Sequence, residues 1–120
     1  MNFKTQAGHW RFAAARFPDA VHFTLDPQYL RDDDYNWIYS WEAIAVDLVV
    51  AARKGGAPAA VLVHGNPELP PGTISIRSIV RHIMRDECAM PYLRIDDCIE
   101  CEDAFIAALR PLTPQGRPPG

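Results

Sequence analysis

Hydrophobic and polar residues change their spacing along the chain, and the change predicts where strands give way to helices. A short apolar run at 60–63 ends abruptly at His64-Gly65, a pattern typical of a buried strand. Apolar residues then recur at helical spacing from Ile76 to Ile83, which predicts an amphipathic helix that ends near 86–88. The loop between them, 66–72, contains three prolines and a glycine and predicts neither a helix nor a central strand.

Two further elements precede this strand. Residues 20–25 alternate and carry β-formers, so they predict a first strand that ends at Asp26-Pro27. A long helix follows, whose start we expect to be capped by Asp34 or Asn36 and whose end is marked by two glycines after Lys54. Its predicted buried face consists of Trp37, Trp41, Ile44, Ala45, Leu48 and Ala52. This strand, the helix and the buried strand then predict a parallel unit.

The two ends of the chain are predicted to differ from its middle. Residues 1–19 form a helical lead-in, whose helix starts near Trp10 and stops at Pro18. Residues 104–110 fit either a strand or a short helix by pattern alone. Residues 112–120 are rich in proline and glycine, which predicts a disordered tail. The sequence thus predicts one α/β domain over residues 20–111.

Composition and charge restrict the class of protein. The chain has 120 residues, 48% hydrophobic and 22% charged, which suits one globular domain and is too few for two cores. A net charge of -3 argues mildly against a nucleic-acid binder, although clustered arginines can override the global sign. The longest apolar runs are too short or too interrupted to span a bilayer, which predicts no membrane partner.

Cysteine usage bears on location and on cofactors. Three cysteines without a signal peptide favour a reducing compartment, so we expect a cytoplasmic protein. Cys98 and Cys101 have the spacing of a metal-binding or redox pair, with Cys88 as a further thiol. A structural zinc site usually needs two such pairs, and acidic neighbours disfavour a reactive thiolate. We therefore expect free thiols and no cofactor at these positions.

The strand end, the loop and the second helix together make a candidate anion site. Gly65 and Asn66 follow the strand, and Arg77, Arg81 and Arg85 recur every four residues along one helix face. Backbone N–H groups at a helix start and neighbouring guanidinium groups both bind phosphate. The alternative is a solvated basic face whose charge is offset by nearby acids.

Asp26 and His64 are candidate catalytic residues, because both stand at the predicted ends of neighbouring parallel strands. A carboxylate and an imidazole that face one crevice can carry out acid–base chemistry or hold a divalent metal. Each also has a structural interpretation. Asp26 can cap a turn before proline, and His64 can hold its own loop in shape by hydrogen bonding.

Large aromatic residues at the start of the long helix suggest a different kind of function. Trp37, Tyr39 and Trp41 are numerous for so small a domain. An exposed aromatic surface indicates a contact between proteins, so one alternative is a non-enzymatic interaction module or a homodimer formed through this helix. Burial in the core is the simpler interpretation of aromatics at helical spacing.

Three stretches resemble the motifs of the small MutS-related (Smr) domain. In that family the first strand ends in Leu-Asp-x-His, the second ends in His-Gly-x-Gly, and Leu-Arg-x-x-Val opens the second helix. The corresponding stretches here are Leu25-Asp26-Pro27-Gln28, His64-Gly65-Asn66-Pro67 and Ile76-Arg77-Ser78-Ile79-Val80. Gln28 stands at the place of the first histidine, and Pro67 at that of the second glycine. The resemblance covers roughly residues 20–110. The chain also resembles a group of small bacterial proteins that have a His-Gly loop and an Arg-Ser-x-Val-Arg helix start.

The resemblance implies a two-layer α/β sandwich of order β-α-β-α-β-β with a four-stranded mixed sheet, as in the C-terminal domain of translation initiation factor 3. Under that order, residues 104–110 form a strand that pairs with the Cys98 region as a hairpin. Smr domains bind nucleic acid and several are endonucleases. The resemblance therefore implies DNA or RNA as partner, with catalytic roles at Asp26, His64 and Arg77.

The leading hypothesis from the sequence is a nucleic-acid-binding, Smr-like domain whose endonuclease activity is weak or lost. Phosphate would be held by the His-Gly loop and the second helix, through Gly65, Asn66, Arg77, Arg81 and Arg85. The interaction module is the first alternative. An enzyme that acts on a small phosphorylated molecule or a nucleotide at the same anion site is the second.

Overall fold

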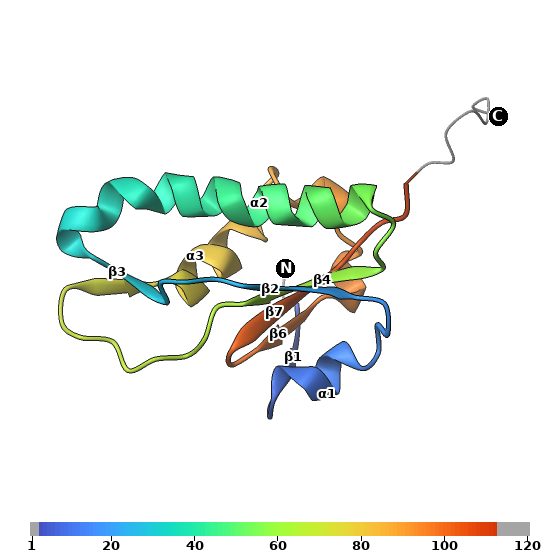
Figure 1. Cartoon of the computed structure of the whole chain (residues 1–120), viewed down its shortest axis with the longest axis horizontal. Helices are drawn as coiled ribbons and strands as arrows, with labels where there is room; N and C mark the ends of the chain where they lie inside the picture. Colours follow the sequence, from blue (N-terminus) through green and yellow to red (C-terminus); the bar gives the residue numbers. More distant parts are fainter. Residues whose placement is uncertain (1–2, 113–120) are drawn as a thin grey trace.

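The computed structural model describes residues 3–112 of the chain, apart from the side chains of residues 32, 34 and 35, and statements about residues 3–112 refer to the remaining side chains. Its centre is a five-stranded mixed sheet in the order β1–β6–β7–β4–β2 (Figure 1). The strands of this sheet are β1 (Lys4–Gln6), β2 (Val21–Thr24), β4 (Ala59–Val63), β6 (Ile99–Cys101) and β7 (Ala104–Ala108). A separate antiparallel pair joins β3 (Tyr29–Arg31) to β5 (Thr73–Ser75).

Helices connect these strands. The α-helices are α1 (Trp10–Ala14), α2 (Ile38–Lys54) and α3 (Ile76–Ile83). Short 3-10 turns are η1 (Asp32–Trp37), η2 (Met90–Tyr92) and η3 (Ile95–Asp97). Among residues 3–112, no helix is both long enough and apolar enough to cross a membrane.

Strands β4 and β7 lie at the middle of the sheet. Strand β4 pairs in parallel with β2 and antiparallel with β7, and β7 also pairs antiparallel with β6. The parallel β2–α2–β4 unit and the β6–β7 hairpin predicted from the sequence are both confirmed. The apolar run of β4 is continuous because its side chains are covered on both faces of the sheet.

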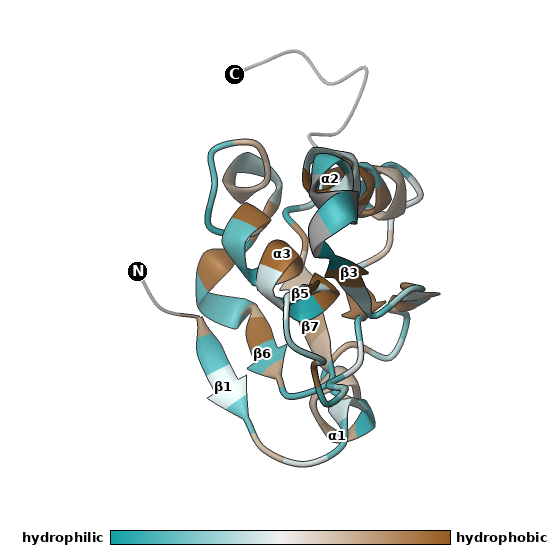
Figure 2. Cartoon of the chain, turned by 90° about the vertical axis from the view of Figure 1, so that its left-hand side faces the viewer, coloured by the Kyte–Doolittle hydropathy of each residue, from teal (hydrophilic) through white to brown (hydrophobic). Residues whose placement is uncertain are grey.

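The two faces of the sheet are covered by different helices. Helices α2 and α3 pack on one face over a large core that includes Leu62, Val80 and Phe105. Helix α1 lies on the opposite face, where Trp10 and Ala13 pack against Val61 and Ile106. Figure 2 shows the same order from the end of the molecule, with α1 on the far side of β7 from α2 and α3.

The predicted four-stranded, two-layer arrangement needs correction. The N-terminal segment is not only a helical lead-in, because Lys4–Gln6 adds a fifth strand in parallel register with β6. Helix α1 then forms a third layer. Phe3 explains why this segment joins the domain, since its side chain is 4% exposed and its ring meets that of Phe105 edge-on at 5.1 Å. The predicted tail lies outside the described residues from 113 onward.

Helix α2 is covered on a narrower stripe than its sequence predicts. Ala45, Val49 and Ala52 are buried, whereas Trp37 and Ile44 are 58% and 39% exposed. The expected cap at Asn36 is also wrong, and the side chain of Asp34 lies outside the described part of the structure. The chain enters α2 directly from η1, so Trp37 occupies the N-cap position and makes no side-chain capping bond. Only one side of α2 meets β4 and α3, which leaves its other side uncovered.

Candidate functional site

The His-Gly loop is fixed by main-chain hydrogen bonds to the β6–β7 turn. The amides of His64 and Gly65 both donate to the carbonyl oxygen of Asp103, at 3.1 and 2.9 Å. Gly65 has φ +75°, a left-handed conformation that glycine adopts without strain. The end of β4 and the tip of the neighbouring hairpin therefore form one rigid corner of the sheet.

The imidazole of His64 lies inside this corner and is 0% exposed. Its Nδ1 is 2.6 Å from the carbonyl oxygen of Gly65, so Nδ1 carries the proton and donates it to that oxygen. Burial lowers the pKa of His64 from 6.5 to about 4, with smaller lowering contributions from the positive charges of Arg81 and Arg77. The ring is thus neutral at neutral pH, and Nε2 is an acceptor.

Four buried side-chain polar atoms have no hydrogen-bond partner among the described residues, and one of them, Nε of Arg81, still lies 3.0 Å from the Glu100 carboxylate. The other three are Nε2 of His64, Nε of Arg77 and Oδ1 of Asp103, and we refer to these three residues as the polar cluster. Arg77 and Asp103 both lie close enough to His64 to act on its pKa. Buried polar groups are nearly always paired, so a cluster of unpaired ones indicates a place for water or a ligand.

The other two arginines of the candidate anion site, Arg81 and Arg85, both bind one buried carboxylate. Glu100 on β6 is 5% exposed, and its Oε2 lies 3.0 Å from Nε of Arg81. The other carboxylate oxygen accepts from Nη2 of Arg85. Arg81 also donates to the carbonyl oxygen of Cys101 at 3.1 Å, and the Arg85 guanidinium lies 4.8 Å from the ring centre of Phe3.

Of the three arginines, Arg77 alone has no carboxylate partner within residues 3–112. Its side chain is half-buried at the first turn of α3, whose start is capped by the Ser75 hydroxyl accepting from the amide of Ser78 at 3.0 Å. Arg77 and Arg81 also line an open groove of about 300 Å³ beside the β1 edge, together with Glu102. Of these three arginines, Arg77 thus combines a place in the polar cluster with access to solvent.

Asp26 does not join this arrangement. It is exposed beyond the end of β2, and among the described side chains no hydrogen bond or ion pair joins it to His64. His64 and Arg77 are therefore brought together as predicted, whereas the expected pairing of Asp26 with His64 is not seen. Asn66 is exposed on the loop.

Gln28 contacts the His-Gly loop in place of Asp26. A Cβ atom on Gly65 would lie 2.5 Å from the Gln28 amide, so this side chain sits directly over the glycine. The main-chain carbonyl of Gln28 accepts from the amide of Ile76 at 2.9 Å, which links β3 to the start of α3. One feature of the sequence could have indicated this contact: Gln28 stands where the first Smr motif has a histidine.

Asp103 and Glu100 were also missed by the sequence interpretation. Both lie in the β6–β7 hairpin, 15 residues or more away in sequence from the arginines that they approach in space. The predicted helix end near 86–88 is too late, because α3 ends at Ile83 and Arg85 follows it. No pattern within this stretch indicates that a buried acid on another strand will neutralise Arg81 and Arg85. The sequence of β6 does not indicate the buried acid either, because all three residues of the strand are buried and no alternation of buried and exposed positions occurs.

The part of the chain that the structure describes contains no group of three or more His, Cys, Asp or Glu side chains arranged to hold a metal ion. Cys88, Cys98 and Cys101 are free thiols. Burial raises the pKa of the Cys98 thiol to about 11, which makes it unreactive at neutral pH.

No family model, curated protein or solved structure matches this chain. The chemistry of the site therefore has to follow from its own residues. These residues offer one free, positioned guanidinium, a rigid glycine loop and unpaired buried polar atoms, but no exposed acid–base pair.

Proposed function

We propose that this chain is a nucleic-acid-binding domain of Smr-like organisation, which holds a backbone phosphate at the His-Gly loop and the start of α3. The element order β2–α2–β4–α3–β6–β7 supports the likeness, because it is the order of the Smr family and of the C-terminal domain of translation initiation factor 3. On this proposal, β1 and α1 are additions at the N-terminus.

The observation that carries the proposal is the state of Arg77. A guanidinium without a carboxylate partner, half-buried beside a helix start, is placed to donate to a phosphate oxygen. A phosphodiester oxygen would satisfy the Nε–H of Arg77, which has no acceptor among the described residues. The groove beside β1 gives the backbone of a polymer access to this guanidinium.

Binding without cleavage is the form of the function that the geometry favours. General acid–base catalysis needs a group within hydrogen-bond reach of the reacting atoms and with a pKa near the working pH. His64 is 0% exposed, and its pKa is lowered to about 4. Asp26 is exposed, and among the described side chains no hydrogen bond or ion pair joins it to His64, so the two do not form a catalytic pair. The proposal therefore assigns His64 the role of holding the loop.

Fluorescence anisotropy with labelled single-stranded and double-stranded oligonucleotides tests this proposal. Arg77→Gln should weaken binding at low salt and reduce the slope of log affinity against log salt by about 1, the change expected for one lost phosphate contact. Arg16→Gln is the matched control, because Arg16 is an exposed arginine on the α1 side. Absence of binding at low salt, or equal losses in the two variants, would refute the proposal.

Exposed aromatic side chains on the first turns of α2 favour one second candidate, a protein-interaction or homodimer surface. Trp37 and Tyr39 are 58% and 80% exposed, and Ile44 is 39% exposed. An open apolar groove of about 350 Å³ runs beside them between α2 and α3, lined in part by Tyr39, Val46 and Ile83. Large exposed apolar side chains gathered in one region are typical of interaction sites.

Sedimentation velocity over a range of concentrations tests the second candidate. If the aromatic surface forms a homodimer, the wild-type sedimentation coefficient should rise with concentration, and Trp37→Ser with Tyr39→Ser should keep the protein monomeric. Both side chains are mainly exposed, so the double variant should keep its thermal stability. A wild-type protein that stays monomeric at the highest concentrations excludes the homodimer.

A further inference from the structure

Two apolar hollows adjoin between α2 and α3. One, of about 330 Å³, is lined in part by Ile38 and Ile79, and the other, of about 350 Å³, is lined in part by Tyr39 and Val46. Glu42 lines both hollows, so they form one surface, which we call the α2–α3 groove. It shares no residue with the polar cluster.

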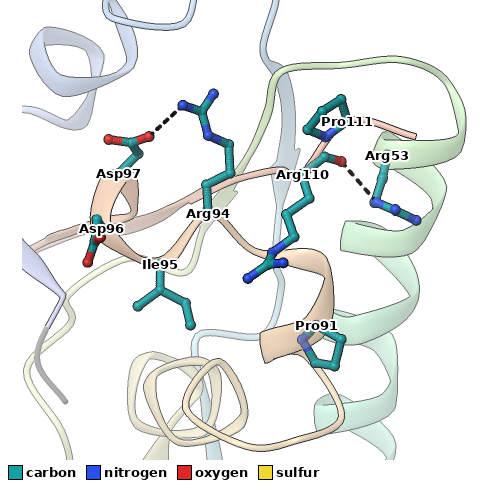
Figure 3. Close-up of a pocket in the computed structure, with 8 residues that line it drawn as sticks. All are labelled: Arg53, Pro91, Arg94, Ile95, Asp96, Asp97, Arg110 and Pro111. Atoms are coloured by element: carbon teal, nitrogen blue, oxygen red, sulfur yellow. Dashed lines mark hydrogen bonds and ion pairs between the residues drawn. The ribbon is translucent and has the colours of Figure 1, made fainter. Parts of the chain in front are cut away.

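The chemistry of this groove differs from that of the largest pocket, which lies near the C-terminal end of α2. That pocket measures about 880 Å³, and most of the side chains that line it are charged (Figure 3). Nε of Arg53 and Nε of Arg110 each donate to a main-chain carbonyl oxygen at 2.9 Å. Arg94 pairs with Asp97 at 3.0 Å. Figure 3 shows the guanidinium groups of Arg53 and Arg110 pointing in different directions, so the pocket indicates no single ligand.

The α2–α3 groove instead presents apolar side chains from two helices. Those from α2 and α3 include Ile38, Tyr39, Val46, Ile79 and Ile83. The α2 residues that line the groove run from Ile38 to Asp47, a distance of about 13 Å along the helix axis at 1.5 Å per residue. The main-chain groups of a helix are bonded within the helix, so a partner has to bind here through side chains rather than as an added strand.

Acidic side chains surround this apolar lining. Glu42 and Asp47 are part of the lining itself, and so is Cys88, which follows α3. Asp86 raises the pKa of the Cys88 thiol through hydrogen bonding and charge. The charges of Glu42 and Glu87 raise the pKa of this thiol further. Carboxylates from α2 and from the segment after α3 therefore gather around one apolar surface.

Little positive charge offsets these acids. Among the described side chains, no lysine or arginine forms an ion pair with any of them, and Glu42 has one contact of this kind, with the His82 imidazole at 3.9 Å. A metal ion does not explain them either, because the described residues contain no group of three or more side chains arranged to hold one. A cationic partner would supply the missing counter-charge.

We propose that the α2–α3 groove binds an amphipathic helix of another protein, whose lysine or arginine side chains flank its apolar face. Apolar side chains of the partner would pack between α2 and α3, and its cations would pair with Glu42 and Asp47. A second copy of this chain fits less well, because a twofold contact places the same acidic surface on both sides. The proposal thus names a partner for the second candidate surface described above, on which it rests, and does not depend on nucleic-acid binding.

Fluorescence anisotropy with a labelled synthetic peptide tests this proposal. The peptide has about 14 residues, with leucines at helical spacing and lysines between them, and it should bind saturably. A peptide that keeps the lysines but carries alanine in place of leucine should bind at least about tenfold more weakly, because it buries less apolar surface. A peptide with glutamate in place of lysine should not bind, since its charges repel the acids.

A matched pair of substitutions on α2 locates the binding. Ala43→Lys places a cation at an exposed position in the groove and should weaken peptide binding about tenfold, equivalent to roughly 1.4 kcal/mol. Ala51→Lys makes the same change at an exposed position about two turns further along α2 and outside the groove lining. Ala51→Lys should therefore bind the peptide as the wild type does.

A second variant tests the role of the acids without adding a side chain to the groove. Asp47→Asn should weaken peptide binding at low salt and less so at high salt, because salt screens the lost attraction. Asp19→Asn, which removes an exposed acid ahead of β2, is its control. Equal affinities of these two variants at low salt would overturn the charge complementarity on which the proposal depends.

The proposal is also overturned if the alanine or the glutamate peptide binds as tightly as the leucine–lysine peptide, or if Ala43→Lys and Ala51→Lys bind alike. A wild-type dimer that Ala43→Lys dissociates would assign the groove to a second copy instead. Arg77→Gln should leave peptide binding unchanged, and Ala43→Lys should leave oligonucleotide binding unchanged. Failure of this proposal is therefore distinguishable from failure of nucleic-acid binding at the His-Gly loop.

Discussion

His64 is a neutral imidazole inside the folded protein, and this has a consequence for stability at acid pH. Its side chain is 0% exposed, and burial holds its pKa at about 4 rather than 6.5. The unfolded chain therefore takes up a proton on this residue at a higher pH than the folded chain does. In this window the unfolded state binds more protons, so stability falls as the pH decreases.

Replacement of His64 by Asn should remove this dependence. In the wild type, His64 lowers the free energy of unfolding progressively as the pH falls from 6.5 to about 4. The accumulated loss is on the order of 3 kcal/mol below that range, and His64 contributes no pH dependence above it. Asn keeps an N–H donor for the Gly65 carbonyl. Urea unfolding at several pH values should show a smaller loss for His64→Asn between pH 6.5 and 4, and parallel curves would contradict the assignment.

Gly65 allows a separate test at the scale of a single residue. Gly65→Ala places a Cβ on a backbone with φ +75°, which should destabilise the fold by about 1–2 kcal/mol. The new Cβ would also overlap the Gln28 amide, but that flexible end can swing into solvent. The effects of Gly65→Ala and Gln28→Ala on chemical unfolding should therefore be nearly additive. If Gln28→Ala instead restored most of the stability lost in Gly65→Ala, the overlap with the Gln28 side chain, and not the backbone conformation, would be the cause of the loss.

At the scale of elements, the face of α3 that carries the arginines is partly neutralised from inside the fold. Glu100 on β6 binds Arg81 and Arg85, so the helix presents less positive charge to solvent than its sequence indicates. Arg77 is the exception and gives the proposed binding site its charge. The division of roles along α3 depends on how the β6–β7 hairpin is placed beneath it.

Glu100→Gln tests this division. Removal of the carboxylate should destabilise the protein by about 1–3 kcal/mol. The effect is smaller than for a fully buried pair, because the Arg81 and Arg85 side chains are 30% and 36% exposed and can turn to solvent. The two released cations should strengthen oligonucleotide binding and steepen its salt slope by about 1 to 2. Asp19→Asn, which removes an exposed acid ahead of β2 and outside the groove, is the control, and equal salt slopes in the two variants would contradict this account.

The elements differ in how far the sequence could predict them. The apolar run of β4 and the helical spacing from Ile76 to Ile83 indicate their structures directly, because long or strongly periodic segments carry their own signal. Strands β1, β3 and β5 each have three residues, too few for any period to show. Their formation depends on partners elsewhere in the chain, such as Phe105 beside Phe3.

The candidate site, like the fold, could be predicted from the sequence only in part. His64 and Arg77 could be placed together because one ends a strand and the other begins the next helix. Asp103 and Gln28 could not, since a hairpin tip and a short strand reach the loop only through tertiary packing. The mistaken pairing of Asp26 with His64 assumed that neighbouring strand ends always face one crevice.

At the scale of the whole molecule, three surfaces with different chemistry lie apart from one another. The polar cluster lies at the C-terminal end of β4, and an open pocket lined in part by Arg53, Arg94 and Arg110 lies at the other end of the sheet. The exposed aromatics lie on the first turns of α2. Such separation allows each surface to be altered without disturbing the other two, which is the basis of the variant pairs described above.

The whole molecule should bind nucleic acid without cutting it. Incubation of the purified protein with labelled DNA and RNA, with and without Mg²⁺ or Mn²⁺, should leave the oligonucleotides intact under conditions where anisotropy shows binding. The physical reason is the absence of an exposed acid–base pair around Arg77 in the described part of the chain. Metal-dependent cleavage that disappears in His64→Asn would contradict this expectation.

The place where an oligonucleotide contacts the protein tests the central claim most directly. A titration of 15N-labelled protein with a short single-stranded oligonucleotide at low salt would map the contact residue by residue. The proposal predicts that the largest shifts occur at the amides of Gly65 and Asn66 and at the Nε–H of Arg77. Shifts confined to the pocket lined by Arg53, Arg94 and Arg110 or to the first turns of α2, or no shifts at all, would contradict it.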